Sequence, residues 1–215
     1  AWDSGASSQQ IIPGNRDGYV QFQVVLGGKS TNVGFTYRDE DFGTFEPYQL
    51  SLNGNGAVSA PGMSSTSPDY LLPGDWLRIR HYSSSNEVTY QKKQLVDQEQ
   101  PSVALAIGQK VLIKNNFSRP RVNSSATLNF NAGNYAYIDG ISGTGQPLFR
   151  KDGTTSQAYL ASTLPRGYYW EVVEQVEDYV TFHTDSNPTT GQDLIIDSAF
   201  FHIGSRLSDV TIVTL

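Results

Sequence analysis

The segment that most constrains the fold runs from Tyr48 to Ser59, with the sequence YQLSLNGNGAVS. Its first half alternates in polarity with a period of two, which is the pattern of a strand with one buried face. Asn53-Gly54-Asn55-Gly56 follows, and Asn-Gly supplies the positive φ angles of a tight hairpin turn. Two more alternating runs, 74–82 and 87–91, are joined by a polar Ser-Ser-Ser-Asn turn. Short strands joined by such turns predict an antiparallel β-sandwich or barrel.

Helical patterns are nearly absent from the rest of the chain. No 12-residue window combines apolar spacing of the i, i+3, i+4, i+7 kind with capping residues. The best candidate for a helical turn is the short segment 156–162. We therefore predict an all-β protein.

The composition indicates a neutral polar surface and an acidic balance. Charged residues make up 17% of the 215 residues and the formal net charge is −6. The nearest approach to a basic patch is Arg78, Arg80, Lys92 and Lys93, which are spread over two expected strands. A phosphate-binding protein carries a concentrated basic surface, so we expect no nucleic-acid partner.

No residue pattern in the sequence indicates one particular cellular compartment. The chain has no cysteine, so disulfides and thiolate metal sites are excluded. No apolar run approaches the roughly 18 residues of a membrane helix, and the first residues do not read as a signal peptide. We expect no membrane insertion. Neutral polar surfaces are typical of extracellular, virion or cell-surface proteins, and that is the expected location.

The middle of the chain, about 98–157, differs in character from its flanks. It contains an apolar stretch at 104–114 and many Asn and Gly residues. One interpretation is a single β-sandwich domain over 1–215 with an insertion at about 98–157. The alternative is two related β halves, 1–98 and 99–215, because Leu72-Pro73 recurs as Leu164-Pro165, 92 positions later.

Several stretches resemble a known fold. Residues 5–12 and 14–22 resemble the opening of concanavalin A-like lectin/glucanase jelly-roll modules, as found in phage tail or fibre proteins and bacterial adhesins. Residues 194–205 and 207–212 resemble the closing strands of these modules. The resemblance covers about 5–94 and 179–213. It implies an antiparallel jelly-roll β-sandwich with sugar or surface recognition as its commonest role, and it assigns no binding residue.

Catalytic patterns are missing. A jelly-roll glycosidase needs paired carboxylates on one strand face, and the nearest run is Glu171–Asp178. Glu171 and Glu174 differ by an odd number and point to opposite faces of a strand, so we expect this run to be a solvated strand end. No HExxH or G-x-S-x-G motif occurs either. We expect a protein that is not an enzyme and has no catalytic residues.

The first candidate ligand site is the loop around residues 38–45. Asp39 and Asp41 offer oxygen ligands, and Phe42 and Phe45 offer rings that stack on a pyranose. Because carboxylate oxygens bind calcium, these two acids make calcium the one candidate cofactor, although their spacing matches no known calcium loop. No other cofactor or metal is expected.

Two further clusters carry side chains suited to a glycan. Asn134, Tyr135 and Tyr137 lie in a Gly-bearing segment. Trp76 begins a strand on which Trp76, Arg78, Arg80 and Tyr82 share one face. We expect that face to be the exposed one, and its Trp, Arg and Tyr content suits a partner surface. The alternative is that the middle segment of the chain covers it.

The leading hypothesis is non-catalytic recognition of a cell-surface glycan by a receptor-binding or adhesion module. The alternatives are a structural or assembly module that packs as a homo-oligomer in a virion or extracellular filament, and a polysaccharide-degrading enzyme.

Overall fold

The computed structural model describes residues 4–24, 31–36, 48–54, 56–63, 71–160, 163–185, 194–200 and 208–215. All the regular structure in these residues is β-strand, and every strand pair with a described register is antiparallel. The all-β prediction is therefore confirmed. The helical turn expected at 156–162 is wrong, because Gln157–Tyr159 forms strand β13 and pairs with β12. Tertiary pairing outweighs the weak helical preference of this short segment.

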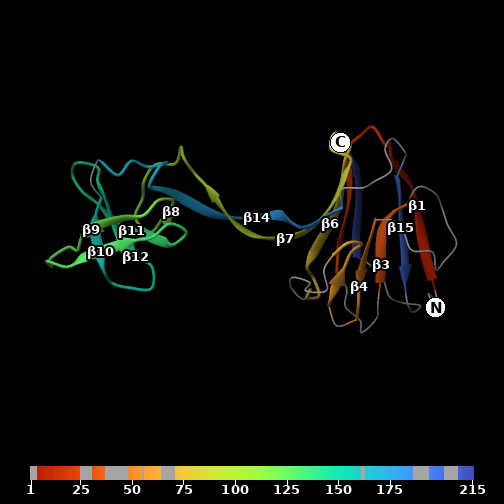
Figure 1. Cartoon of the computed structure of the whole chain (residues 1–215), viewed down its shortest axis with the longest axis horizontal. Helices are drawn as coiled ribbons and strands as arrows, with labels where there is room; N and C mark the ends of the chain where they lie inside the picture. The colour runs from red at the N-terminus through yellow and green to blue at the C-terminus, as the bar shows by residue number, and fades with distance from the viewer. Residues whose placement is uncertain are drawn as a thin grey trace. The chain divides into compact units, whose positions relative to one another are not determined.

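The chain divides into two compact units. Unit 1 comprises residues 1–94 and 178–215, and unit 2 comprises residues 95–177. The chain leaves unit 1 along the long strand β7 (Glu87–Glu99) and returns along β14 (Trp170–Asp185) (Figure 1). The middle segment of about 98–157 lies within unit 2.

Unit 1 contains two groups of paired strands. The first has the order β1-β15-β3-β4-β5, and the second has the order β14-β7-β6-β2-β16. Besides β7 and β14, the strands are β1 (Ser4–Ile12), β2 (Gly18–Gln23), β3 (Thr31–Thr36), β4 (Tyr48–Leu52), β5 (Val58–Ser59), β6 (Trp76–Tyr82), β15 (Leu194–Phe200) and β16 (Ser208–Thr214). Strands from the beginning and the end of the chain pair with each other in both groups, β1 with β15 and β2 with β16.

The hairpin predicted from the Asn-Gly segment is present. Leu52 pairs with Val58 across the turn between β4 and β5. The backbone N of Ala57 donates to Asn53 Oδ1 at 2.8 Å, and Gly56 has φ of 90°. Glycine takes this left-handed conformation without the steric cost that a side chain would impose.

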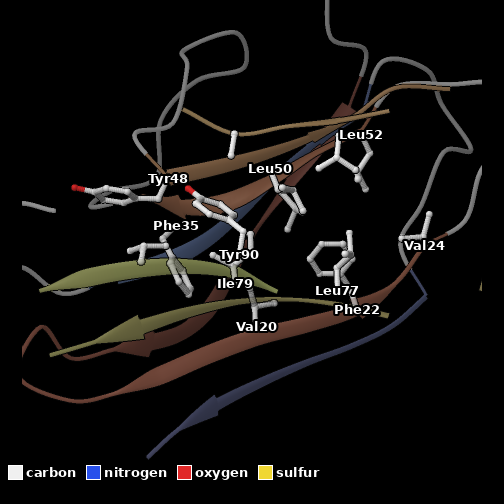
Figure 2. Close-up of a cluster of buried hydrophobic side chains, with 14 of the residues drawn as sticks. Val20, Phe22, Val24, Phe35, Tyr48, Leu50, Leu52, Leu77, Ile79 and Tyr90 are labelled. Carbon is white, nitrogen blue, oxygen red and sulfur yellow. The ribbon is translucent and has the colours of Figure 1, made fainter. Parts of the chain in front are cut away.

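The core of unit 1 lies between its two groups of strands (Figure 2). Phe35, Leu50 and Leu52 enter it from β3 and β4, and Phe22 and Ile79 enter it from β2 and β6. Burial alternates along β2 and β6, because successive side chains of a strand point to opposite faces. Each of these strands therefore has a core side and an outward side.

Unit 2 has its own core, and β14 takes part in the strand orders of both units. Its main strand order is β13-β12-β11-β8-β14, and β9 pairs with β10 separately. These strands are β8 (Lys110–Ile113), β9 (Phe117–Pro120), β10 (Thr127–Phe130), β11 (Tyr135–Ile141), β12 (Pro147–Lys151) and β13 (Gln157–Tyr159). The core is rich in aromatic rings, with Phe149 5.0 Å from Trp170 and Phe117 4.9 Å from Phe130 between centroids. Edge-to-face and offset contacts of this kind stabilise a core beyond the area they bury.

Glu171 corrects one sequence-based expectation. The run from Glu171 to Asp178 was expected to be solvated, and Glu174 and Glu177 are indeed exposed. Glu171, however, is 1% exposed and accepts a hydrogen bond at 2.5 Å from Arg166 Nε. The two residues are only five positions apart, but the turn before β14 brings them together, and no periodic pattern encodes that contact.

Candidate functional site

The outward side of β6 and its neighbours in unit 1 gathers polar and aromatic side chains. Arg78 lies opposite Gln21 of β2 and Gln91 of β7 in the sheet register. Arg80 lies opposite Tyr19 and Thr89 in the same way. We call this surface the Arg78 face and define it as Tyr19, Gln21, Arg78, Arg80, Thr89, Gln91, Tyr179 and Thr181. Because directly opposite side chains in an antiparallel sheet have Cβ atoms about 5 Å apart, these groups form one continuous surface.

Arg78 is held in place by rings and by a hydrogen bond. Its guanidinium carbon lies 4.1 Å from the ring centroid of Tyr19 and 3.6 Å from that of Tyr179. Its Nη2 donates to Gln21 Oε1 at 3.0 Å. Cation–π contacts of this kind contribute about 0.5–2 kcal/mol each, depending on solvent access. The contacts fix the orientation of the guanidinium before any ligand arrives.

Tyr179 presents a neutral phenol. Burial raises the pKa of Tyr179 above its ordinary value, and the positive charges of Arg78 and Lys93 act in the opposite direction. At neutral pH the hydroxyl is therefore protonated, and the charge of the Arg78 face comes from its cations.

The Arg78 face holds polar atoms with unused hydrogen-bonding capacity. Among the described residues, four buried side-chain atoms on this face have no hydrogen-bond partner: Arg78 Nε, Arg80 Nε, Thr89 Oγ1 and Gln91 Oε1. Thr89 and Gln91 are each 6% exposed, and only the amide nitrogen of Gln91 is bonded, to Thr181 Oγ1 at 3.1 Å. Each buried polar atom left unpaired costs about 1–3 kcal/mol. Such atoms are rare in folded proteins, so their clustering on one face marks it as unusual.

The arginines of this face lack carboxylate partners. In the part of the chain that the structure describes, neither Arg78 nor Arg80 forms an ion pair. Among the acidic residues, Asp17 interacts electrostatically with Arg80. Two hydrogen bonds from Ser83, from its backbone and its hydroxyl, hold the pKa of Asp17 below its ordinary value, and the charge of Arg80 lowers it further. Arg80 is thus partly balanced by Asp17, whereas Arg78 has no such neighbour.

Unit 2 has a comparable face, but its charges are paired internally. Lys110 Nζ lies 3.0 Å from Asp97 and 3.8 Å from the ring centroid of Tyr135. A hydrogen bond from Tyr135, followed by the Lys110 pair, lowers the pKa of Asp97. Arg150 pairs with Asp139 at 3.3 Å. A face whose charges already neutralise one another offers less to a charged ligand.

The residues predicted from the sequence are divided between the two units. Trp76 begins β6 in unit 1, opposite Gln23 and on the same side of the strand as Arg78. Tyr135 and Tyr137 lie on β11 of unit 2, and Asn134 is exposed in the turn before it. The remaining candidates, which include both weak calcium ligands, lie outside the described residues: Asp39, Asp41, Phe42 and Phe45.

The sequence pattern identified β6 but missed its neighbours. Leu77, Ile79 and His81 are buried, and the alternate residues Trp76, Arg78, Arg80 and Tyr82 face away from them, as the alternation predicted. The residues that sequence reasoning missed are Tyr19, Gln21, Thr89, Gln91, Tyr179 and Thr181. Thr89 and Gln91 lie in the alternating run 87–91, but nothing in the sequence states which strands pair.

The described residues also bear on metal binding and on membrane insertion. No group of three or more His, Cys, Asp or Glu side chains is arranged there to hold a metal ion. No helix in the same residues is long and apolar enough to span a bilayer. The chain matches no protein family model, no curated protein and no solved structure.

Proposed function

We propose that this protein recognises a cell-surface glycan without catalysis, and that the Arg78 face of unit 1 is the binding surface. We also propose that unit 1 is a jelly-roll β-sandwich. We further propose that the protein acts outside the cell, in a phage tail or fibre or on a bacterial surface.

The clustering of unpaired polar atoms on the Arg78 face carries this proposal. Sugar hydroxyls both donate and accept hydrogen bonds, so they match the unpaired Thr89 and Gln91 oxygens and the arginine Nε atoms. These atoms are buried in the unbound chain, so binding requires the side chains that cover them to move. Tyr19 and Tyr179 provide rings beside them, and the half-buried Trp76 lies on the same side of β6. Planar groups next to directed polar groups are the combination that binds saccharides.

An assembly module is the second candidate, supported by apolar side chains at the surface of unit 2. Leu95 is 60% exposed, Ile107 69% and Tyr168 61%. Large exposed apolar side chains favour association when they form a continuous patch. Sedimentation of the purified chain over a range of concentrations tests this. A stable oligomer that binds no glycan would favour assembly over recognition.

A glycan array with the purified chain tests the leading proposal. Two variants should weaken binding: Tyr19→Ala, which removes a ring from the Arg78 face, and Gln91→Leu, which removes its unpaired oxygen. Arg150→Gln, on the outward face of unit 2, is the matched control and should bind as the parent does. Circular dichroism confirms that each variant is folded. Parent binding that survives both face variants, or an array with no bound glycan, would refute the proposal.

Calcium is tested in the same experiment. The array is run once with calcium and once with EDTA, because Asp39 and Asp41 are proposed as weak calcium ligands. Binding that disappears in EDTA would support a calcium-dependent site at that loop, and unchanged binding would remove calcium from the proposal.

A further inference from the structure

Arg78 is a cation that the protein orients but does not neutralise. Tyr19 and Tyr179 lie against its guanidinium at 4.1 and 3.6 Å, and Gln21 accepts one hydrogen bond from Nη2. Arg78 Nε has no partner, and no described carboxylate lies within ion-pair distance. A long side chain normally loses rotamer entropy when it binds a ligand. Because these contacts already order Arg78 in the unbound chain, it loses less rotamer entropy on binding.

The charge around Arg78 is positive although the chain is acidic. Arg80 follows two residues later on the same side of β6. The whole chain has a formal net charge of −6, so this face is a local exception. A locally positive surface attracts an anionic ligand.

Arg150 of unit 2 provides an internal comparison. It also lies near a tyrosine ring, with its guanidinium carbon 5.2 Å from the centroid of Tyr137. Unlike Arg78, it pairs with a carboxylate of its own unit, Asp139. The same residue type in a similar setting is thus neutralised on one face and left without a counterion on the other.

The end of the Arg78 guanidinium is the part left for a ligand. Nε is buried and Nη2 already donates to Gln21, so Nη1 and the second hydrogen of Nη2 remain as donors. A carboxylate can accept two parallel hydrogen bonds from these two nitrogens. The tyrosines and amides around Arg78 are suited to the sugar ring that carries the carboxylate.

We propose that the glycan bound by the Arg78 face is acidic and that Arg78 pairs with its carboxylate, as found in uronic or sialic acids. This inference rests on the proposed function, because it names the ligand class of the same surface.

The test compares acidic oligosaccharides with their own methyl esters on the full chain. Galacturonate, glucuronate and sialic-acid-terminated oligosaccharides are titrated by calorimetry, each beside its uncharged methyl ester. We expect at least one acid to bind about 10- to 100-fold more tightly than its ester, since a charge-assisted bidentate pair contributes that much. Arg78→Gln should abolish the preference, Arg78→Lys should keep part of it, and Arg150→Gln should leave it intact.

The outcomes separate this inference from the function on which it rests. Equal binding of acid and ester would overturn the carboxylate pair and leave glycan recognition standing. Tighter binding of sulfated sugars or single-stranded DNA than of any carboxylated sugar would also overturn it. Failure of every glycan to bind would overturn both proposals. If Arg78→Gln does not fold, the comparison of acid with ester on the parent chain decides the question.

Discussion

Thr89 carries a buried, unpaired hydroxyl on the Arg78 face. Because this hydroxyl has no partner, it costs free energy in the folded protein. We expect Thr89→Val, which keeps the shape and removes the hydroxyl, to stabilise the chain by up to about 1 kcal/mol. The same substitution should weaken glycan binding. Thermal unfolding and a binding titration on one preparation measure both effects, and a destabilised variant with full affinity would contradict the role given to Thr89.

We expect the stability of unit 1 to depend on pH through Asp17. Its carboxylate accepts two hydrogen bonds from Ser83, each of 2.8 Å, and its pKa is lowered in the folded state. A lowered pKa means that Asp17 stabilises the fold above the ordinary value of 3.8 and that this contribution is lost as the pH falls through the folded value.

The variant Asp17→Asn isolates that contribution. We expect it to be less stable than the parent by about 1 kcal/mol at pH 7, because a charge-assisted hydrogen bond is replaced by a neutral one. The gap should narrow steadily below about pH 4, as the parent's carboxylate is protonated. Melting temperatures from pH 7 down to pH 3 test this, and a gap that stays constant with pH would assign the effect to something other than the charge.

At the scale of elements, β6 was predictable and its partners were not. The alternation in 76–82 assigns each side chain of β6 to a face, because side-chain direction in a strand depends only on local backbone geometry. The pairing of β2 with β6 joins residues that are more than fifty positions apart. Such pairing depends on packing across the whole unit, which a single sequence does not display.

The turn before β14 is held by an ion pair whose carboxylate, that of Glu171, is buried. Arg166 donates to Glu171 and to the backbone oxygen of Val103 at 2.6 Å, and it also donates to the backbone oxygen of Gln100. We expect Arg166→Met to destabilise unit 2 by about 3–5 kcal/mol, because it leaves Glu171 charged and buried without its partner.

A second ion pair of unit 2 serves as the control. Lys114 and Glu99 form a more exposed pair at 2.9 Å, and Lys114→Met should cost less than about 1 kcal/mol. Denaturation followed by the fluorescence of the buried Trp170 compares the two variants. If both variants lost a similar free energy of unfolding, burial would not determine how much an ion pair contributes to stability.

At the scale of the whole molecule, the described residues form two separate cores, and each core draws only on its own unit. Ile79 and Phe149 are both fully buried, one in each core. We expect Ile79→Ala to lower the melting temperature of one calorimetric transition and Phe149→Ala that of another, since each leaves a cavity costing about 2–5 kcal/mol. One shared transition that both variants lower equally would show that the units unfold as a single body.

The sequence supported the all-β class and the outward face of β6 through local alternation and turn chemistry. It did not place Glu171, whose burial depends on Arg166 in a non-periodic turn. It proposed both Trp76 and Tyr137 as ligand candidates, but it did not show that they lie in different units. Local patterns report strand faces, whereas a site requires pairings that only the folded chain defines.

Hydroxyl-radical footprinting of the full chain, with and without the tightest-binding glycan from the array, tests the central proposal most directly. We predict that the glycan protects Tyr19, Tyr179 and the peptide containing Arg78 and Arg80 from oxidation. Tyr135 and Tyr137 in unit 2 should react equally in both samples. Protection confined to unit 2, or to residues away from the Arg78 face, would contradict the assignment of the binding surface.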